Sequence, residues 1–179
     1  MSYPVSLQER KEELTQAREK LVAELSAEQP EGALGAGNER WSVTEIAYHI
    51  HLVEKLVAGM IQQALASGSR QEFDEEKLQQ EWEKIATVAL DRTDRIQAPA
   101  PVMPATPPSL NESLQLLEES RKELFALVDS LGKDALASVG IPHITQRMGV
   151  LSGLGWVTLI GYHDLRHLDQ IKELKASLA

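Results

Sequence analysis

The sequence predicts an all-α fold, a single bundle of helices joined by long crossover loops. Aromatic residues make up only 4% of the 179 residues, and the strong helix formers Ala, Leu, Glu, Gln and Lys dominate. Apolar residues recur at helical spacing over several long stretches. Between these stretches lie segments rich in proline or glycine, which interrupt helices. No internal repeat is visible, so residues 1–179 are expected to form one domain.

The first helix is expected from about Ser6 to Ala27. Its apolar residues recur at helical spacing, which places them on one face of the helix: Leu7, Leu14, Ala17, Leu21 and Leu25. Residues 28–41 follow with the sequence EQPEGALGAGNERW. Because proline and glycine interrupt helices, this segment is expected to form a loop.

A second helix is expected from Val43 to Ala66. Either Ser42 or Thr44 can cap its amino end, and Glu45 stands three residues after Ser42 as in a capping box. The sequence SGSR ends this helix. A third helix, rich in Glu and Lys, is expected from Asp74 to Ile96.

Residues 97–109 contain five prolines and are expected to form an extended crossover. Ser109 is expected to cap a fourth helix that ends near Gly132. Residues 132–149 show no regular pattern and are expected to be irregular. The last helix is expected to begin between Val150 and Trp156 and to run to the carboxyl terminus.

The composition limits the possible partners. The net charge is −9 and no stripe of Lys and Arg is visible, which argues against nucleic acid. The chain has no cysteine, which excludes disulfides, thiolate metal sites and a cysteine nucleophile. No apolar run approaches the ~18 residues of a membrane span, and the first residues lack the layout of a signal peptide. We therefore expect a cytoplasmic protein without a membrane partner.

Two of the five histidines, His163 and His167, stand four residues apart on the predicted last helix. This spacing places two imidazoles about 40° apart and about 6 Å along the axis, so both can bind one metal ion. They lie within one apolar face, formed by Trp156, Ile160, Ile171, Leu174 and Leu178. We therefore expect them to point into the bundle, where an imidazole needs a partner. Ordinary core histidines are the alternative.

The second helix offers a partner for this pair. Its apolar face comprises Ile46, Ile50, Val53, Val57, Met60 and Ile61. His49 lies about 70° from the centre of that face and can point inward, whereas His51 lies about 130° away, toward solvent. The candidate metal ligands are therefore His49, His163 and His167. His143 lies in the irregular segment and receives no role, and Gln170 is expected to bond a ligand imidazole or bound water.

No residue stands out as a general acid or base. Glu45 and Glu54 lie off the apolar face of the second helix, and the acids at 74–76 favour the dipole at a helix start. Asp164 and Arg166 are expected to face solvent or to pair locally. The last helix carries a second apolar face, which indicates either full burial or a dimer contact: Leu154, Val157, Leu165 and Leu168. A homodimer is the expectation.

Two segments of the chain resemble the DinB family. The first is WSVTEIAYH, Trp41–His49, in which a histidine follows a Trp-Ser pair at eight residues from the Trp. The second is HDLRHLDQI, His163–Ile171, in which an H-x-x-x-H pattern precedes a Gln-Ile pair. Outside these two segments the chain is similar in layout alone. One departure is Leu168 and Asp169, where relatives often carry Arg-Gly before the Gln.

The resemblance implies a four-helix bundle with long crossovers and an up-down-down-up order of helices. It implies one divalent metal ion, held by His49 from the second helix and by His163 and His167 from the last. It also implies a dimer. Some relatives are metal-dependent transferases that use a low-molecular-weight thiol such as bacillithiol or mycothiol. Others are described as hydrolases, and many have no known activity.

Three neutral ligands leave at least one position of a metal ion open, which is typical of a catalytic site. Such an ion can lower the pKa of bound water or bind a thiol as thiolate. Imidazole does not discriminate among zinc, nickel, manganese and iron, so the metal is not predicted. We expect a metal-dependent transferase or hydrolase acting on a small molecule. The alternative is a non-catalytic metal-binding or stress-response bundle whose metal only stabilises the fold.

Overall fold

The structure is a computed structural model that describes residues 6–30, 33, 40–68, 70–93, 97–145 and 147–178. Helices dominate this part of the chain. The five α-helices are α1 (Leu7–Ser26), α2 (Val43–Ala66), α3 (Glu75–Leu90), α4 (Leu110–Ala137) and α5 (Gly153–Ala176). A short 3-10 helix, η1 (Ala100–Val102), lies in the crossover between α3 and α4. None of the described helices is both long enough and apolar enough to cross a membrane.

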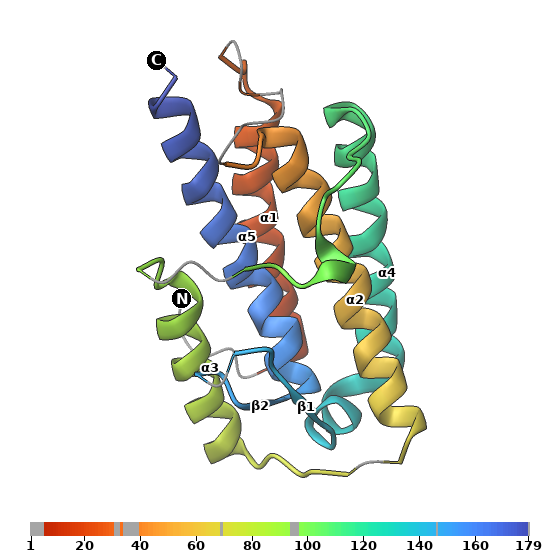
Figure 1. Ribbon diagram of the computed structural model, residues 1–179. Helices are drawn as coiled ribbons and strands as arrows, with labels where there is room; N and C mark the ends of the chain where they lie inside the picture. Colours follow the sequence, from red (N-terminus) through yellow and green to blue (C-terminus); the bar gives the residue numbers. More distant parts are fainter. Residues whose placement is uncertain are drawn as a thin grey trace.

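Four of the helices form the bundle. α1 and α5 pack side by side and run in the same direction, and α2 and α4 pack side by side and run in the opposite direction (Figure 1). α3 packs against α5 outside the bundle. The crossover passes across the bundle from α3 to η1, which packs on α2. The all-α prediction and the up-down-down-up order of a four-helix bundle are therefore confirmed.

Serine side chains start four of the five α-helices. Ser6, Ser42 and Ser109 each accept a hydrogen bond from the backbone three residues later, and a glutamate there bonds back, as in a capping box. Ser42, rather than Thr44, is thus the cap of α2. The hydroxyl of Ser152 accepts a hydrogen bond from the backbone N–H of Gly155 at the start of α5, where no glutamate completes a capping box. These bonds satisfy backbone donors that have no partner within the helix.

The third helix is shorter than predicted. It ends at Leu90 rather than at Ile96, which lies outside the described residues. The carboxylate of Asp91 accepts hydrogen bonds from the backbone N–H of Thr93 at 3.0 Å and from its hydroxyl at 2.6 Å. Such local bonds offer the backbone an alternative to the helix, so the helix does not continue past Leu90.

The segment at 132–149 is more regular than predicted. Gly132, with φ 73° and ψ 172°, interrupts the helix as expected, but α4 then resumes as far as Ala137. An antiparallel hairpin of two short strands follows, β1 (Gly140–Pro142) and β2 (Val150–Ser152). Strands of three residues are too short to show an alternating pattern in the sequence. The hairpin leads directly into α5 because Ser152 also caps that helix.

The core consists of two apolar clusters separated by buried charges. One cluster includes Leu14, Val57, Leu124 and Ile160, and the other includes Leu21, Ile50, Leu117 and Leu168. Between them lies one charged residue from each bundle helix, none more than 8% exposed: Arg18, Glu54, Arg121 and Asp164. We call these four residues the charged layer.

The charged layer is fully paired within itself. Asp164 accepts hydrogen bonds from Arg18 Nε and from Arg121 Nη2, both at 2.9 Å. Glu54 accepts hydrogen bonds from Arg121 Nε at 2.5 Å and from the hydroxyl of Ser120 at 2.6 Å. The prediction that Asp164 faces solvent or pairs locally is therefore wrong. Each carboxylate neutralises the charge of a guanidinium. The hydrogen bonds compensate for the free-energy cost of removing four charges from water.

The second apolar face of α5 is buried within the chain. Leu154, Val157 and Leu168 are almost inaccessible, and Leu165 packs against the same core. α5 contacts all four of the other α-helices, which cover it on several sides. Of the two outcomes expected for this face, the structure shows full burial. The face therefore gives no support for a dimer, which stays a prediction.

Candidate metal centre

Three histidine rings converge between α2 and α5. His49 comes from α2, His163 and His167 come from α5, and nitrogen atoms of all three rings lie within 4.8 Å of one another. In a tetrahedral zinc site two imidazole nitrogens lie about 3.3 Å apart. The Nε2 atoms of His163 and His167 lie 3.1 Å apart, which is close to this spacing. The structure thus brings together the three residues that the sequence selected.

The orientation of His49 is fixed by the crossover. Its Nδ1 lies 2.7 Å from the carbonyl oxygen of Val102 in η1, which can only accept, so Nδ1 carries the proton. Nε2 is then the unprotonated nitrogen, the form in which an imidazole binds a metal ion. The ring of Trp41 packs against His49 with 4.6 Å between the ring centroids. Trp41 and Val102 therefore hold the imidazole in one position.

The pair on α5 is fixed from one side only. His167 Nδ1 donates to the side-chain oxygen of Gln170 at 2.8 Å, so the predicted contact between Gln170 and a candidate ligand is confirmed. His167 Nε2 then accepts from Nε2 of His163. The Nδ1 atom of His163 is buried and has no hydrogen-bond partner among the described residues. Buried polar atoms rarely lack a partner, so the cluster is incomplete as a hydrogen-bonded core.

Burial keeps the three rings neutral. It lowers the pKa of His163 and of His167 well below the ordinary value for histidine, and the neighbouring rings lower both further. Burial also lowers the pKa of His49, and the bond to Val102 opposes part of that shift. Neutral imidazole is the form that binds metal ions. Among the described residues no carboxylate joins the cluster, so the donor set fits a divalent ion held by three neutral nitrogens.

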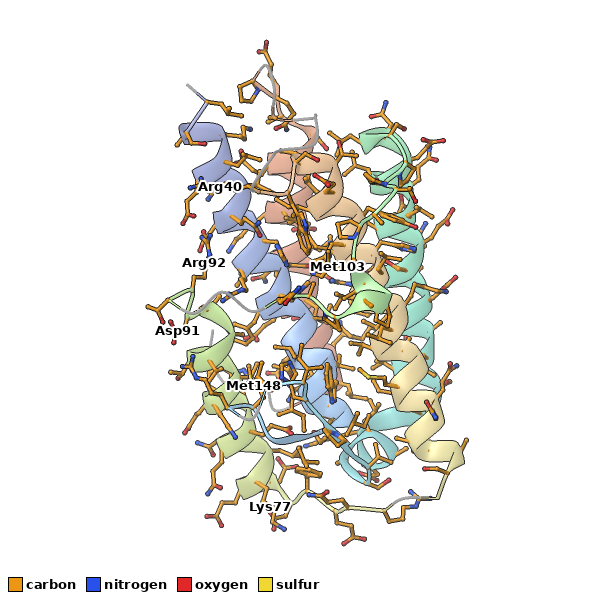
Figure 2. The ribbon with its side chains drawn as sticks, in the orientation of Figure 1. Arg40, Lys77, Asp91, Arg92, Met103 and Met148 are labelled. Atoms are coloured by element: carbon orange, nitrogen blue, oxygen red, sulfur yellow. The ribbon has the colours of Figure 1, made fainter. Side chains whose placement is uncertain are left out.

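The three rings line a pocket of about 700 Å³. The pocket lies between α2, α3, α5 and the crossover, and its walls are largely apolar, with Val53, Val57 and Trp156 among them. In Figure 2 Met103 lies on the crossover and Met148 lies lower, in the loop that joins β1 and β2; both line the pocket. A cavity of this size and character is typical of sites for small molecules.

His143, which received no role from the sequence, also lines the pocket. Its Nδ1 accepts a hydrogen bond from the backbone N–H of Thr145 at 3.1 Å, so the proton of the neutral ring lies on Nε2. Its ring packs against Trp156 at 5.1 Å between centroids. Only the folding of the hairpin back onto α5 brings His143 to this position, and no local sequence pattern signals it.

His51 lies outside the cluster, as expected, but it does not face solvent. Its Nδ1 lies 3.1 Å from the carbonyl oxygen of Leu116, so the ring packs against α4 and is half-buried. The wide apolar face of α2 explains the difference, because α2 contacts both α4 and α5. A residue 130° from the centre of one face can therefore still meet a neighbouring helix.

Three arginines from distant parts of the chain line the same pocket: Arg40, Arg92 and Arg166. Arg166 Nη1 donates to the carbonyl oxygens of Ala89 and Asp91 at 3.1 and 2.6 Å, so it binds the end of α3 and does not face solvent or pair locally. Burial and the charge of Arg92 lower the pKa of Arg166. These arginines lie far apart in sequence, which is why no basic cluster was visible.

Comparison with known proteins identifies relatives over most of the chain. A family model described as the DinB superfamily matches residues 7–171. The chain is 28% identical over 142 residues to the uncharacterized protein YuaE of Bacillus subtilis (strain 168), and the match covers 78% of this chain and 80% of that protein.

A solved structure shows the same fold. The crystal structure of TT2238, described as a four-helix bundle protein, matches 92% of this chain and 96% of its own, with a TM-score of 0.57 and 24% sequence identity. At this identity the likeness concerns the fold alone. It agrees with the arrangement of α1, α2, α4 and α5 given above.

Proposed function

The chain belongs to the DinB superfamily, and from this premise we propose that it binds one divalent metal ion through His49, His163 and His167 and acts on a small molecule. The proposed reaction is either transfer to or from a low-molecular-weight thiol or hydrolysis. The observation that carries the proposal is the convergence of three neutral imidazoles at the wall of a pocket of about 700 Å³.

The residues around the cluster support metal binding. Val102 and Gln170 each take the Nδ1 proton of one ring, which leaves the Nε2 atoms of His49 and His167 unprotonated. Ligand histidines are usually oriented in this way by a carbonyl or side-chain oxygen. A divalent ion at this place supplies Lewis acidity, which lowers the pKa of water or of a thiol.

The pocket supports an enzyme over a purely structural metal site. A structural site is closed, with all its ligands from the protein, whereas a catalytic site keeps a position open to solvent or substrate. Here the three histidines face a cavity large enough for a small molecule. Its apolar walls exclude bulk water from one side of a bound substrate, and His143 Nε2–H is a further donor in the same lining. Since the chain has no cysteine, any reacting thiol must come from solution.

The metal site is tested by titration of metal-free protein with zinc, nickel, manganese and ferrous iron. Isothermal titration calorimetry should show one ion bound per chain. Substitution of His49, His163 or His167 by Ala should weaken binding by at least about a hundredfold, since each removes one of three ligands. H51A is the matched control because His51 lies on the same helix outside the cluster. No binding to the wild-type protein, or equal loss in H51A, contradicts the proposal.

Catalysis needs a separate test, since a metal can bind without reacting. The metal-loaded protein is assayed with bacillithiol or mycothiol and an electrophilic aromatic chloride, and with small esters and amides. Turnover that disappears in H163A supports an enzyme. One bound ion that raises the melting temperature, with no turnover in any assay, supports the non-catalytic bundle. Size-exclusion chromatography with light scattering tests the proposed homodimer on the same preparations.

A further inference from the structure

The pocket is positively charged although the protein as a whole is acidic. The chain has a net charge of −9, yet three arginines line the pocket and Glu173 is the one acidic residue in its described lining. Glu173 is already paired, because its carboxylate accepts two hydrogen bonds from Arg92 at 2.5 and 2.7 Å. Neither Arg40 nor Arg166 forms an ion pair among the described residues; the charge of Asp91 acts on Arg166, but its carboxylate is bound by Arg147. In Figure 2 Arg92 lies at the end of α3 beside α5.

Arg166 is the better placed of these two arginines. One of its nitrogens, Nη1, binds the two carbonyl oxygens at the end of α3, which fixes the guanidinium at the pocket wall. The charge of Arg166 lowers the pKa of both His163 and His167, so it lies near the histidine cluster. A guanidinium presents several donors in a fixed plane, and one nitrogen held by the protein leaves others for a ligand. A charge in a partly dry cavity attracts anions strongly.

The remainder of the pocket is apolar and open at its rim. Val53, Val57 and Trp156 form the wall, and the rim carries two exposed apolar side chains, Met103 at 42% and Ile144 at 60% exposure. Large apolar side chains exposed beside a cavity are typical of ligand-binding grooves. Apolar walls together with two arginines that form no ion pair suit a ligand that has both an apolar body and a negative charge.

We propose that the pocket binds small amphipathic anions, whose carboxylate or phosphate oxygens pair with Arg166 and Arg40 and whose apolar body lies against the wall around Trp156. This inference rests on the proposed function in that it assigns a substrate class to the same pocket. The arginine contacts need no metal ion, however, so anion binding can be measured in its absence. The neutral histidines provide the reacting end of the pocket and the arginines provide its selectivity for charge.

The test uses two fluorescent probes with the same aromatic body. One is 8-anilinonaphthalene-1-sulfonate, an anion, and the other is N-phenyl-1-naphthylamine, which is neutral. Both are titrated into metal-free and into zinc-loaded protein. We expect the anion to bind about tenfold more tightly, with an affinity that falls as sodium chloride is added. Equal affinities for the two probes overturn the proposal.

Variants locate the binding site. R40Q and R166Q should each weaken the anionic probe about tenfold and leave the neutral probe unchanged. R70Q is the matched control, because Arg70 is exposed, bonds Ser138 and lies outside the pocket lining. R166K keeps the charge and tests whether loss of the bonds to α3 alone causes the effect; near-UV circular dichroism checks the fold. Retention of the anion preference in both R40Q and R166Q overturns the proposal.

Competition separates the two kinds of anion. 1-Naphthoate and 1-naphthyl phosphate are each used to displace the anionic probe, with neutral 1-naphthol as the reference. Stronger displacement by either anion supports the proposal and identifies carboxylate or phosphate as the preferred group; displacement by 1-naphthol at equal concentration contradicts it. Metal titrations on the same samples keep the two hypotheses apart. Anion preference without metal binding rejects only the proposed function, and metal binding without anion preference rejects only this inference.

Discussion

Asp164 Oδ2 accepts a hydrogen bond from Arg18 Nε at 2.9 Å, although the two residues lie 146 positions apart in the chain. Both belong to the charged layer, in which each bundle helix contributes one residue. Asp164 directly follows His163 and precedes His167 by three residues. The pairing therefore holds the turn of α5 that carries two of the candidate ligands and fixes its position relative to α1.

Loss of the Asp164 charge is expected to destabilise the protein strongly. D164N leaves Arg18 and Arg121 buried without their shared carboxylate, which should lower the free energy of unfolding by about 3 kcal/mol or more. Urea denaturation followed by circular dichroism measures this. D169N is the control, since Asp169 is exposed on the same helix and should change stability by no more than about 0.5 kcal/mol. Similar effects for the two variants mean that the layer contributes no special stability.

Gln170 is expected to tune the metal affinity through His167. Q170L removes the acceptor of the His167 Nδ1 proton, and loss of such a partner typically lowers metal affinity by roughly 10- to 100-fold. Q170E keeps an oxygen acceptor and should bind metal at least as tightly as the wild type. Calorimetric zinc titrations compare the three proteins. An unchanged affinity in Q170L means that Gln170 does not orient the ring.

The stability of the metal-free protein is expected to fall as the pH decreases from 7.5 to 5.5. Burial lowers the pKa of His163 and His167 well below about 6.5, so the unfolded chain binds protons that the folded protein does not. The free energy of unfolding is therefore not reduced by these histidines above about pH 6.5. Below that pH it falls progressively, by up to about 1.4 kcal/mol per pH unit for each histidine. Urea denaturation in EDTA gives the slope. H163Q should have a shallower slope, and an equal slope contradicts this account.

Two glycines are expected to respond oppositely to substitution by alanine. A Cβ at Gly153 meets the backbone oxygen of Leu136 at 2.9 Å, and backbone cannot easily move, so G153A should destabilise the protein by about 1–3 kcal/mol. A Cβ at Gly59, inside α2, meets nothing within 4 Å, so G59A should stabilise it by about 0.5–1 kcal/mol. Thermal denaturation measures both changes. Destabilisation by G59A indicates a contact that the bundle does not show.

The helices and the histidine cluster were predictable because their signals are local. Helical spacing and the serine caps define the helices, and His163 and His167 lie one turn apart within a single apolar face. The selection of His49 required only its angle from the apolar face of the second helix. Each of these inferences depends on the residues of a single helix, which is the range over which sequence periodicity is informative.

The pairing within the charged layer was not predictable, because it depends on contacts between different helices. Arg18, Glu54, Arg121 and Asp164 each stand three or four residues from buried apolar residues of the same helix, so the helical period places them on or beside its apolar face. Their partners come from other helices, and the spacing of residues within one helix does not show which carboxylate pairs with which guanidinium. The pocket arginines and His143 likewise meet only after the crossover and the hairpin have folded back. The early end of α3 depends on one side chain, Asp91, whose carboxylate accepts a hydrogen bond from the backbone N–H of Thr93.

The bond between His49 and Val102 joins a structured helix to a connection that has little secondary structure of its own. Any interaction that fixes the His49 ring also stabilises the docked crossover, and by thermodynamic reciprocity release of the crossover weakens that interaction by the same free energy. Proteolysis within residues 97–109 is therefore expected to slow when a metal ion occupies the histidine cluster. The contact between His49 and Val102 therefore couples the proline-rich connection to the histidine cluster.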